Sequence, residues 1–266
     1  MMSTEVCSIK GVNYRIFVAG QGDTMVLLHG GHTNLDIWED QLAYFADKNF
    51  KVIAYDQRGY GHTDIPLEPF AYEEDVRQIL DHFGVEKAII IGASFGGSVA
   101  IDFALAYPDR VRALVLAGPA VNGNKLPFRM KVEGIKCYMT AKKKGIHTAA
   151  AKFEANRYWK YFIPKNESKR QRFMDIFQSN GAFYTWNMKL TKKLQPPAMN
   201  RLSEISAPTL IVEPADDLSF NIQTCKLLER HLPNAHLIRI HDTGHLPNLE
   251  QSDVFNETVN TWLKKL

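Results

Sequence analysis

The chain has 266 residues, of which 45% are apolar, and a formal net charge of +3 at neutral pH. This length fits one α/β domain with an insertion, and the apolar fraction is that of an ordinary globular protein. Because no run of about 18 apolar residues occurs, the sequence predicts no membrane-spanning helix. The region from Met1 to Lys10 lacks the basic-then-apolar layout of a secretory leader, so we expect a cytoplasmic protein.

Short apolar runs bounded by turn residues predict a series of strands. They lie at residues 12–18, 24–28, 51–55, 87–91, 111–117, 209–213 and 236–240. Apolar positions at helical spacing predict helices at residues 38–48, 72–83, 98–107, 223–231 and 253–265. Strands that alternate with helices imply a mostly parallel central sheet flanked by helices, so the predicted fold class is α/β.

The alternation of strands and helices stops between residues 122 and 203. This stretch is rich in lysine and aromatic residues and contains no convincing strand, so we interpret it as an inserted helical lid. Residues 1–121 and 204–266 then form the core. The lid carries 18 basic and 4 acidic residues, whereas the rest of the chain carries 14 basic and 25 acidic residues. Most lysines of such a segment are solvated, but together they raise the encounter rate with anions at low salt.

The basic residues of the segment 122–203 raise the question of a nucleic-acid partner. No nucleic-acid recognition motif accompanies them, so we expect none.

The three cysteines, Cys7, Cys137 and Cys225, are an odd number and lie far apart. They suit neither a disulfide framework nor paired metal ligands, so we expect reduced, partly buried thiols.

The segment Gly92-Ala93-Ser94-Phe95-Gly96 follows an apolar strand directly and precedes a helix expected to begin near Ser98. This is the G-x-S-x-G pattern in its strand–turn–helix context, which lifts a serine hydroxyl clear of a tight turn. A phosphate-binding loop is the competing interpretation, because Gly92 and Gly97 have the spacing of its outer glycines. Ser98 follows Gly97 at once, however, and leaves no place for the lysine of such a loop. The sequence therefore predicts Ser94 as a nucleophile.

A serine hydroxyl is a weak nucleophile, so it needs a base and a carboxylate that orients the base. Asp216 and Asp217 follow a buried strand, in the kind of loop where an α/β sheet gathers catalytic groups. His245 follows the last strand, and Gly244 gives the backbone freedom to place it over the sheet. We expect His245 to be the general base and one of the two aspartates to be the acid.

With these motifs the sequence resembles, over essentially its whole length, the α/β-hydrolase superfamily with a helical lid. The resemblance also rests on the chain order Ser, Asp, His, on the turn at residues 29–32 and on the turn at residues 56–61. It implies an oxyanion hole formed by the backbone N–H of Phe95 and that of Gly31, with His32 as the alternative to Gly31. Pro214 stands where the family often has a glycine three positions before the acid, which selects Asp217, and Asp216 remains the rival.

The resemblance implies a serine hydrolase in which Ser94 attacks an acyl carbonyl, His245 takes its proton and water releases the acyl-enzyme. This chemistry needs no metal or organic cofactor. The expected partner is a small acyl substrate, with an anionic or an aromatic one as options, and carboxylic-ester hydrolysis is the default reaction. Lactone opening, carbon–carbon bond hydrolysis and acyl or peracid transfer use the same triad.

Two other classes of protein compete with this interpretation. A serine at the turn argues against dehalogenase and epoxide hydrolase chemistry, which uses an aspartate in this superfamily. A slow-turnover ligand sensor on the same fold is the alternative from outside the enzymes, because a fold does not determine a function.

Overall fold

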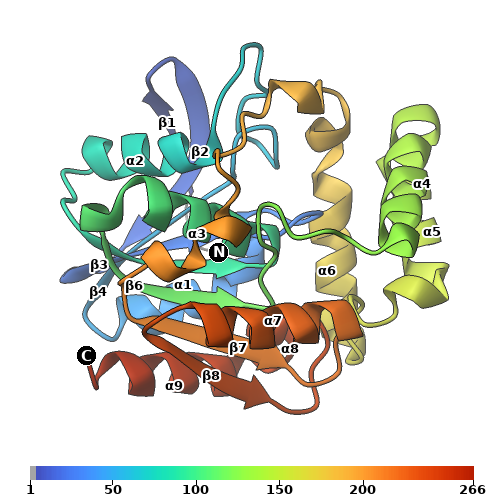
Figure 1. Ribbon diagram of the computed structural model, residues 1–266. Helices are drawn as coiled ribbons and strands as arrows, with labels where there is room; N and C mark the ends of the chain where they lie inside the picture. Colours follow the sequence, from blue (N-terminus) through green and yellow to red (C-terminus); the bar gives the residue numbers. More distant parts are fainter. Residues whose placement is uncertain (1–3) are drawn as a thin grey trace.

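The computed structural model describes residues 4–266, which form an eight-stranded sheet with helices around it (Figure 1). The strand order is β1-β2-β4-β3-β5-β6-β7-β8. The strands are β1 (Glu5–Ile9), β2 (Val12–Ala19), β3 (Asp23–Leu28), β4 (Phe50–Tyr55), β5 (Ala88–Ala93), β6 (Val111–Ala117), β7 (Thr209–Pro214) and β8 (Ala235–Ile240). The pairs from β4 to β8 are parallel, and β1 and β2 add an antiparallel edge. The predicted α/β fold class is confirmed.

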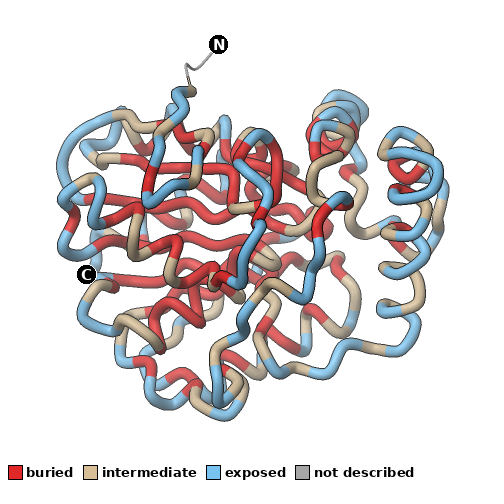
Figure 2. Tube along the Cα trace, turned by 90° about the horizontal axis from the view of Figure 1, so that it is seen from above, coloured by how far each residue is buried: buried red, intermediate tan, exposed pale blue. Residues whose placement is uncertain are grey.

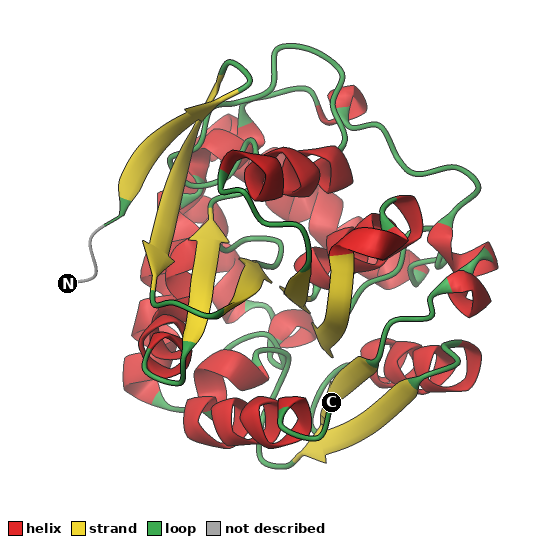
Figure 3. Cartoon of the chain, turned by 90° about the vertical axis from the view of Figure 1, so that its left-hand side faces the viewer, coloured by secondary structure: helices red, strands yellow, loops and turns green. Residues whose placement is uncertain are grey.

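Helices cover both faces of the sheet, as Figure 3 shows. One face carries η1 (Leu35–Trp38), α1 (Glu39–Ala46), α8 (Pro247–Glu250) and α9 (Ser252–Leu263), and the other carries α2 (Tyr72–His82), α3 (Phe95–Ala106) and α7 (Ser219–His231). Successive strand residues point to opposite faces, so in β3 Met25 and Leu27 belong to one apolar core and Val26 and Leu28 to the other. Burial on both sides explains why these strands read as continuous apolar runs.

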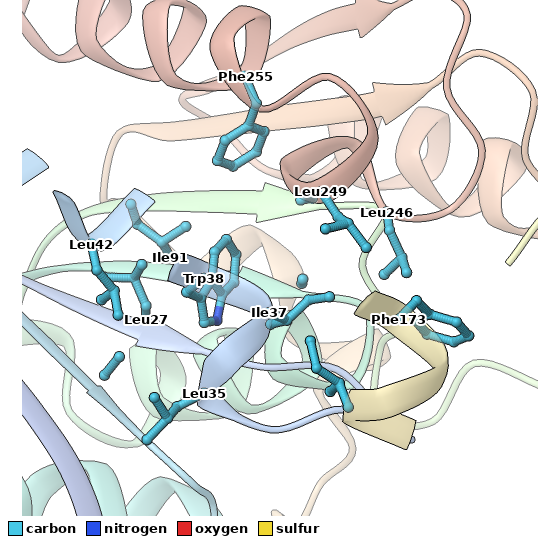
Figure 4. Close-up of a cluster of buried hydrophobic side chains, with 14 of the residues drawn as sticks. Leu27, Leu35, Ile37, Trp38, Leu42, Ile91, Phe173, Leu246, Leu249 and Phe255 are labelled. Carbon is cyan, nitrogen blue, oxygen red and sulfur yellow. The ribbon is translucent and has the colours of Figure 1, made fainter. Parts of the chain in front are cut away.

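The core under α1 and α9 is built around Trp38, which is fully buried (Figure 4). Leu27 and Ile91 of the sheet pack beside it, and Phe255 of α9 lies on the same side. The cluster continues to Phe173, which comes from a helix between β6 and β7. Figure 2 shows the result along the chain, with buried strands in the middle and exposed loops around them.

The seven predicted strands are present with ends that differ by one or two residues, but the edge strand β1 was not predicted. Most of its residues are half-buried or exposed and only Ile9 is buried, so it lacks the apolar run that marks the inner strands. The helix expected near Ser98 begins at Phe95 instead. The turn at Ser94 leads straight into that helix, which keeps Gly96 and Gly97 buried in its first turn.

Residues 122–203, which we call the inserted segment, contain helices and no strand of the sheet. They include α4 (Phe128–Lys144), α5 (Ile146–Ala155), η3 (Arg157–Trp159), α6 (Glu167–Ser179) and η4 (Gly181–Tyr184), followed by the shorter turns η5 (Met188–Leu190), η6 (Ala198–Asn200) and η7 (Leu202–Glu204). In Figure 1, α6 lies between the sheet and α4, which stands at the right-hand edge. In the described part of the chain no helix has the length and apolar character needed to cross a bilayer.

Candidate active site

The turn between β5 and α3 holds Ser94 in a strained conformation. Its φ of +51° and ψ of −113° are unusual for a residue with a side chain. A Cβ atom at Gly92 would lie 2.4 Å from the carbonyl oxygen of Gly96, and one at Gly96 would lie 2.1 Å from that of Leu28. The tightness expected from the sequence is therefore present, and it leaves the Ser94 side chain partly exposed above the sheet.

His245 lies in the loop between β8 and α8, with its Nε2 atom 2.8 Å from Ser94 Oγ. The backbone N–H of His245 donates to the carbonyl oxygen of Tyr161 at 2.7 Å, and the N–H of Gly244 donates to Glu250 Oε1 at 3.0 Å. These bonds hold the loop from two sides, one of them from the inserted segment. Ser94 and His245, which the sequence predicts as nucleophile and base, are 151 positions apart in the chain and lie within hydrogen-bond distance in the structure.

Asp217 completes a continuous hydrogen-bonded row. The Nδ1–H of His245 donates to Asp217 Oδ2 at 2.6 Å, and the other carboxylate oxygen accepts bonds from the N–H of Leu218 and from Asn221 Nδ2 at 2.6 and 2.8 Å. A carboxylate at Nδ1 fixes the ring tautomer, so Nε2 is free to accept the proton of the serine hydroxyl. Asn221 was not singled out from the sequence, although it stands one helical turn after Asp217.

Asp216 points elsewhere. Its carboxylate lies 2.6 Å from Lys165 Nζ, in a pair whose side chains are 44% and 66% exposed. The chain turns at Ala215 and Asp216 and bends at Asp217, and the two carboxylates come to lie in different surroundings. Of the alternatives left open by the sequence, Asp217 is the one in contact with the imidazole.

Two backbone turns approach Ser94 from different elements. Phe95 is the first residue of α3, and Gly30 and Gly31 follow β3, where a Cβ atom at Gly30 would lie only 3.3 Å from that of Ser94. Within residues 4–266, the N–H groups of Phe95, Gly31 and His32 have no hydrogen-bond acceptor. Free N–H groups at a helix start and in a facing turn are the kind of donors that stabilise a developing oxyanion.

Buried polar groups brace the turn after β3. His29 is fully buried, and its Nε2 accepts the N–H of Gln57 at 2.9 Å. Burial lowers the pKa of His29 to about 4, so the ring is neutral and able to accept this bond. Asp56 accepts bonds from the N–H groups of Leu35 and His62 at 2.8 and 2.9 Å. These contacts give His29 and Asp56 structural roles in the turns that follow β3 and β4.

Aromatic rings surround the row of polar groups. The ring of Phe162 lies over the His245 imidazole with 3.9 Å between centroids, and Tyr60 stacks between Phe95 and Phe183 at 6.1 and 4.4 Å. Phe162 and Phe183 come from the inserted segment. The sequence does not indicate which of the many aromatic residues of this segment face the site. The inserted segment thus places an apolar ring directly over the base.

Three basic side chains of the inserted segment are engaged with groups of the core. Lys165 pairs with Asp216, Lys169 donates to the carbonyl of Leu249, and Arg172 binds Asp40. Each of these contacts ties the segment to the core. None of the three cations is free to bind a charged group of a substrate at Ser94.

The family model for the alpha/beta hydrolase fold matches residues 23–252, so the chain belongs to this family. It is a hydrolase of the α/β fold. A 2-hydroxy-6-oxononadienedioate/2-hydroxy-6-oxononatrienedioate hydrolase from Comamonas testosteroni is 29% identical over 93% of this chain and 91% of its own length. A 3-oxoadipate enol-lactonase from Acinetobacter baylyi is 27% identical over 96% and 93% of the two chains. A thermophilic esterase from Thermogutta terrifontis has the same fold, with a TM-score of 0.83, 20% identity and coverage of 99% and 98%.

Proposed function

We propose that the protein is a serine hydrolase that cleaves uncharged carboxylic esters through an acyl-enzyme. The observation that carries the proposal is the row formed by Ser94, His245 and Asp217, with spacings of 2.8 and 2.6 Å. Nucleophile, base and orienting acid are each within hydrogen-bond reach of the next, which is the arrangement that acyl transfer requires.

In this mechanism Ser94 Oγ attacks the ester carbonyl while His245 Nε2 takes its proton. Asp217 stabilises the imidazolium that forms, and the N–H groups of Phe95 and Gly31 bind the oxyanion, each contributing about 3 kcal/mol. The imidazolium then protonates the leaving alcohol. Water, deprotonated by His245, attacks the acyl-enzyme and releases the acid.

The choice of an uncharged ester rests on the walls of the site. By their names, the substrates of the two relatives carry carboxylates. A carboxylate taken out of water needs a cation or several donors to compensate it. Here the ring of Phe162 lies over the His245 imidazole, and Lys165 and Arg172 of the inserted segment are paired with carboxylates of the core. These features favour an apolar acyl or alcohol group.

Lactone or carbon–carbon bond hydrolysis is the second candidate. The two relatives, which match nearly the whole chain, support it: one is named as an enol-lactonase and the other as a hydrolase of a 2-hydroxy-6-oxo-dienedioate. The same nucleophile and base serve all three reactions, so only turnover separates them.

The test combines covalent labelling with a substrate panel. A fluorophosphonate probe should label Ser94, identified by mass spectrometry of the peptide, and p-nitrophenyl acetate, butyrate and octanoate should be turned over in many cycles. Ser94→Ala should lose labelling and at least about 10⁴-fold of kcat. Ser98→Ala, one turn further along the same helix, is the matched control and should retain both.

The other outcomes separate the alternatives. Faster turnover of an enol-lactone or of a 2-hydroxy-6-oxo-dienoate than of any ester would favour the second candidate. Folded protein that is neither labelled nor active on any of these compounds would overturn the enzyme proposal in favour of a ligand sensor.

A further inference from the structure

The outer face of α4 carries an apolar stripe. Phe128, Ile135 and Met139 are spaced by seven and four residues, which places them on one side of the helix. Their exposed fractions are 82%, 62% and 39%. The buried residues of α4, Cys137 and Ala141, lie on the opposite side and pack into the core. The helix therefore has a second apolar face, and within the described chain this face is exposed.

Lysines border the stripe on both sides. At 100° per residue, Lys131 and Lys142 fall on one flank and Lys136 and Lys143 on the other. Lys131, Lys142 and Lys143 make no ion pair with any residue from 4 to 266. They are among the many basic residues of the inserted segment, and the reaction proposed at Ser94 does not involve them.

The one acidic residue of α4 does not interrupt this pattern. Glu133 bonds to Lys136 Nζ at 2.9 Å and to Asn156 Nδ2 at 2.8 Å, and only 14% of its side chain is exposed. It is thus turned toward the rest of the inserted segment. The outer face of α4 presents only apolar and cationic groups.

A groove of about 530 Å³ opens beside the stripe, between α4 and α5. Met139 belongs to both the stripe and the groove, and Phe153 and Trp159 add apolar surface. Four lysines line the groove, and its one carboxylate, that of Glu133, is bonded to Lys136 and Asn156. Apolar groups beside an excess of cations fit a chain with an anionic head, which is the chemistry of an anionic lipid.

We propose that the outer face of α4 binds the surface of an anionic lipid bilayer, with Phe128, Ile135 and Met139 inserted below the headgroups and the flanking lysines bound to them. Amphipathic helices of this composition lie in the plane of the interface. Figures 1 and 2 show α4 at the periphery of the molecule, where a flat surface can reach it. A second copy of the chain is the poorer occupant, because two lysine-bordered helices repel each other.

The test is cosedimentation of the full chain with vesicles of phosphatidylcholine alone or with about one third phosphatidylglycerol. We expect binding to the anionic vesicles, at least about tenfold stronger than to the neutral ones, and a decrease with added salt. Phe128→Ser combined with Ile135→Ser should weaken the binding about tenfold or more. Lys142→Gln and Lys143→Gln should each weaken it up to about fivefold.

Matched variants at other exposed positions serve as controls. Leu67→Ser combined with Val254→Ser removes apolar groups that are 84% and 49% exposed, and Lys226→Gln removes a cation from α7. These variants should bind the vesicles as the parent does. All variants should keep the parent melting temperature and hydrolytic rate on a soluble ester, so failure here is distinct from failure of the proposed function.

Three results would overturn the proposal. One is equal sedimentation with and without vesicles. Another is a loss of binding in the Leu67 and Val254 control as large as that in the α4 variant. The third is a dimer that forms in solution and is abolished by Phe128→Ser, which would assign the face to a second copy of this chain.

Discussion

Asp216 and Asp217 are neighbours in the chain but lie in different environments. Asp217 is buried against His245 and is held by a backbone N–H and by Asn221, whereas Asp216 forms a surface pair with Lys165. A carboxylate at Nδ1 sets the tautomer of the base, and a surface pair contributes little. The two side chains should therefore differ sharply in their importance for turnover.

We expect Asp217→Asn to lower kcat for a p-nitrophenyl ester about 10³- to 10⁴-fold, since the amide can donate to Nδ1 and favour the wrong tautomer. Asp216→Asn should change kcat less than about twofold. Steady-state kinetics on both variants measures this, with circular dichroism to verify folding. A larger loss in the Asp216 variant would contradict the assignment of the acid.

Asp102 on α3 offers a test of pH dependence. It is 8% exposed, and in the described chain its Oδ1 has no hydrogen-bond partner. Burial, with Glu73 nearby, raises the pKa of Asp102 from 3.8 to about 7. Between these values the folded state keeps a proton that the unfolded state has lost, so stability should fall as the pH rises from about 4 to 7 and stay lower above it.

Asp102→Asn should remove this contribution and raise the free energy of unfolding at pH 8 by a few kcal/mol. Each unit of difference between the folded and unfolded pKa values of Asp102 corresponds to roughly 1.4 kcal/mol. Urea unfolding at pH 5 and pH 8 measures it. The exposed Asp109→Asn is the matched control and should leave the pH dependence intact. An Asp102 variant with the parent's pH profile would contradict the prediction.

At the scale of elements, α6 links the inserted segment to the turn that carries Gly31. Phe177 of α6 is fully buried and stacks on the ring of His32, with 4.9 Å between centroids and 6° between planes. His32 also bonds to the hydroxyl of Tyr184 at 2.7 Å. The position of the turn beside Ser94 thus depends on side chains of the inserted segment.

Phe177→Ala should lower the free energy of unfolding by about 3 to 5 kcal/mol through the cavity it creates. It should also lower kcat, because the turn that presents Gly31 loses its support. Phe128→Ala removes an exposed ring from the same segment and should change stability by less than about 0.5 kcal/mol. Denaturation and kinetics of both variants test this, and unchanged kcat in the Phe177 variant would contradict the coupling.

Elements buried on both faces could be predicted well from the sequence. The runs that became β3, β5, β6 and β7 are mostly apolar because nearly all of their residues are buried, with Asp23 and Arg112 as the exposed exceptions. The edge strand β1 was not predicted because its short sequence, EVCSI, contains no apolar run, whereas β8, which is at the other edge and is mostly half-buried or exposed too, was predicted from its apolar residues. Which aromatic residues of the inserted segment face Ser94 depends on how α5 and α6 pack, and helical spacing alone does not report that.

At the scale of the whole molecule, the core and the inserted segment share one apolar cluster. Trp38 and Phe255 belong to the same group of buried residues as Phe153, Phe173 and Phe177 of the inserted segment. Loss of either part would expose the apolar surface of the other. We therefore expect the two parts to unfold together, although they alternate along the chain.

Calorimetry should show one thermal transition, and residues 122–203 should resist proteolysis until that transition begins. A single transition is expected because the two parts bury the same apolar cluster. Unfolding of one part alone would expose that cluster to water, which is unfavourable. Phe173→Ala should lower the melting temperature without splitting the transition. A separate, earlier transition accompanied by cleavage within α4 or α5 would contradict the prediction.

Some properties of this protein could be derived from its sequence because local physics decides them. A serine between two glycines after an apolar strand specifies a tight turn, and alternating apolar runs and amphipathic stretches specify a parallel sheet with helices on both faces. The resemblance favoured Asp217 and kept Asp216 as the rival, and the tertiary structure shows Asp217 in contact with His245. Only the tertiary structure decided that Phe162 lies over the imidazole. Those contacts join residues from distant parts of the chain, and their geometry depends on the packing of whole elements, which no local pattern records.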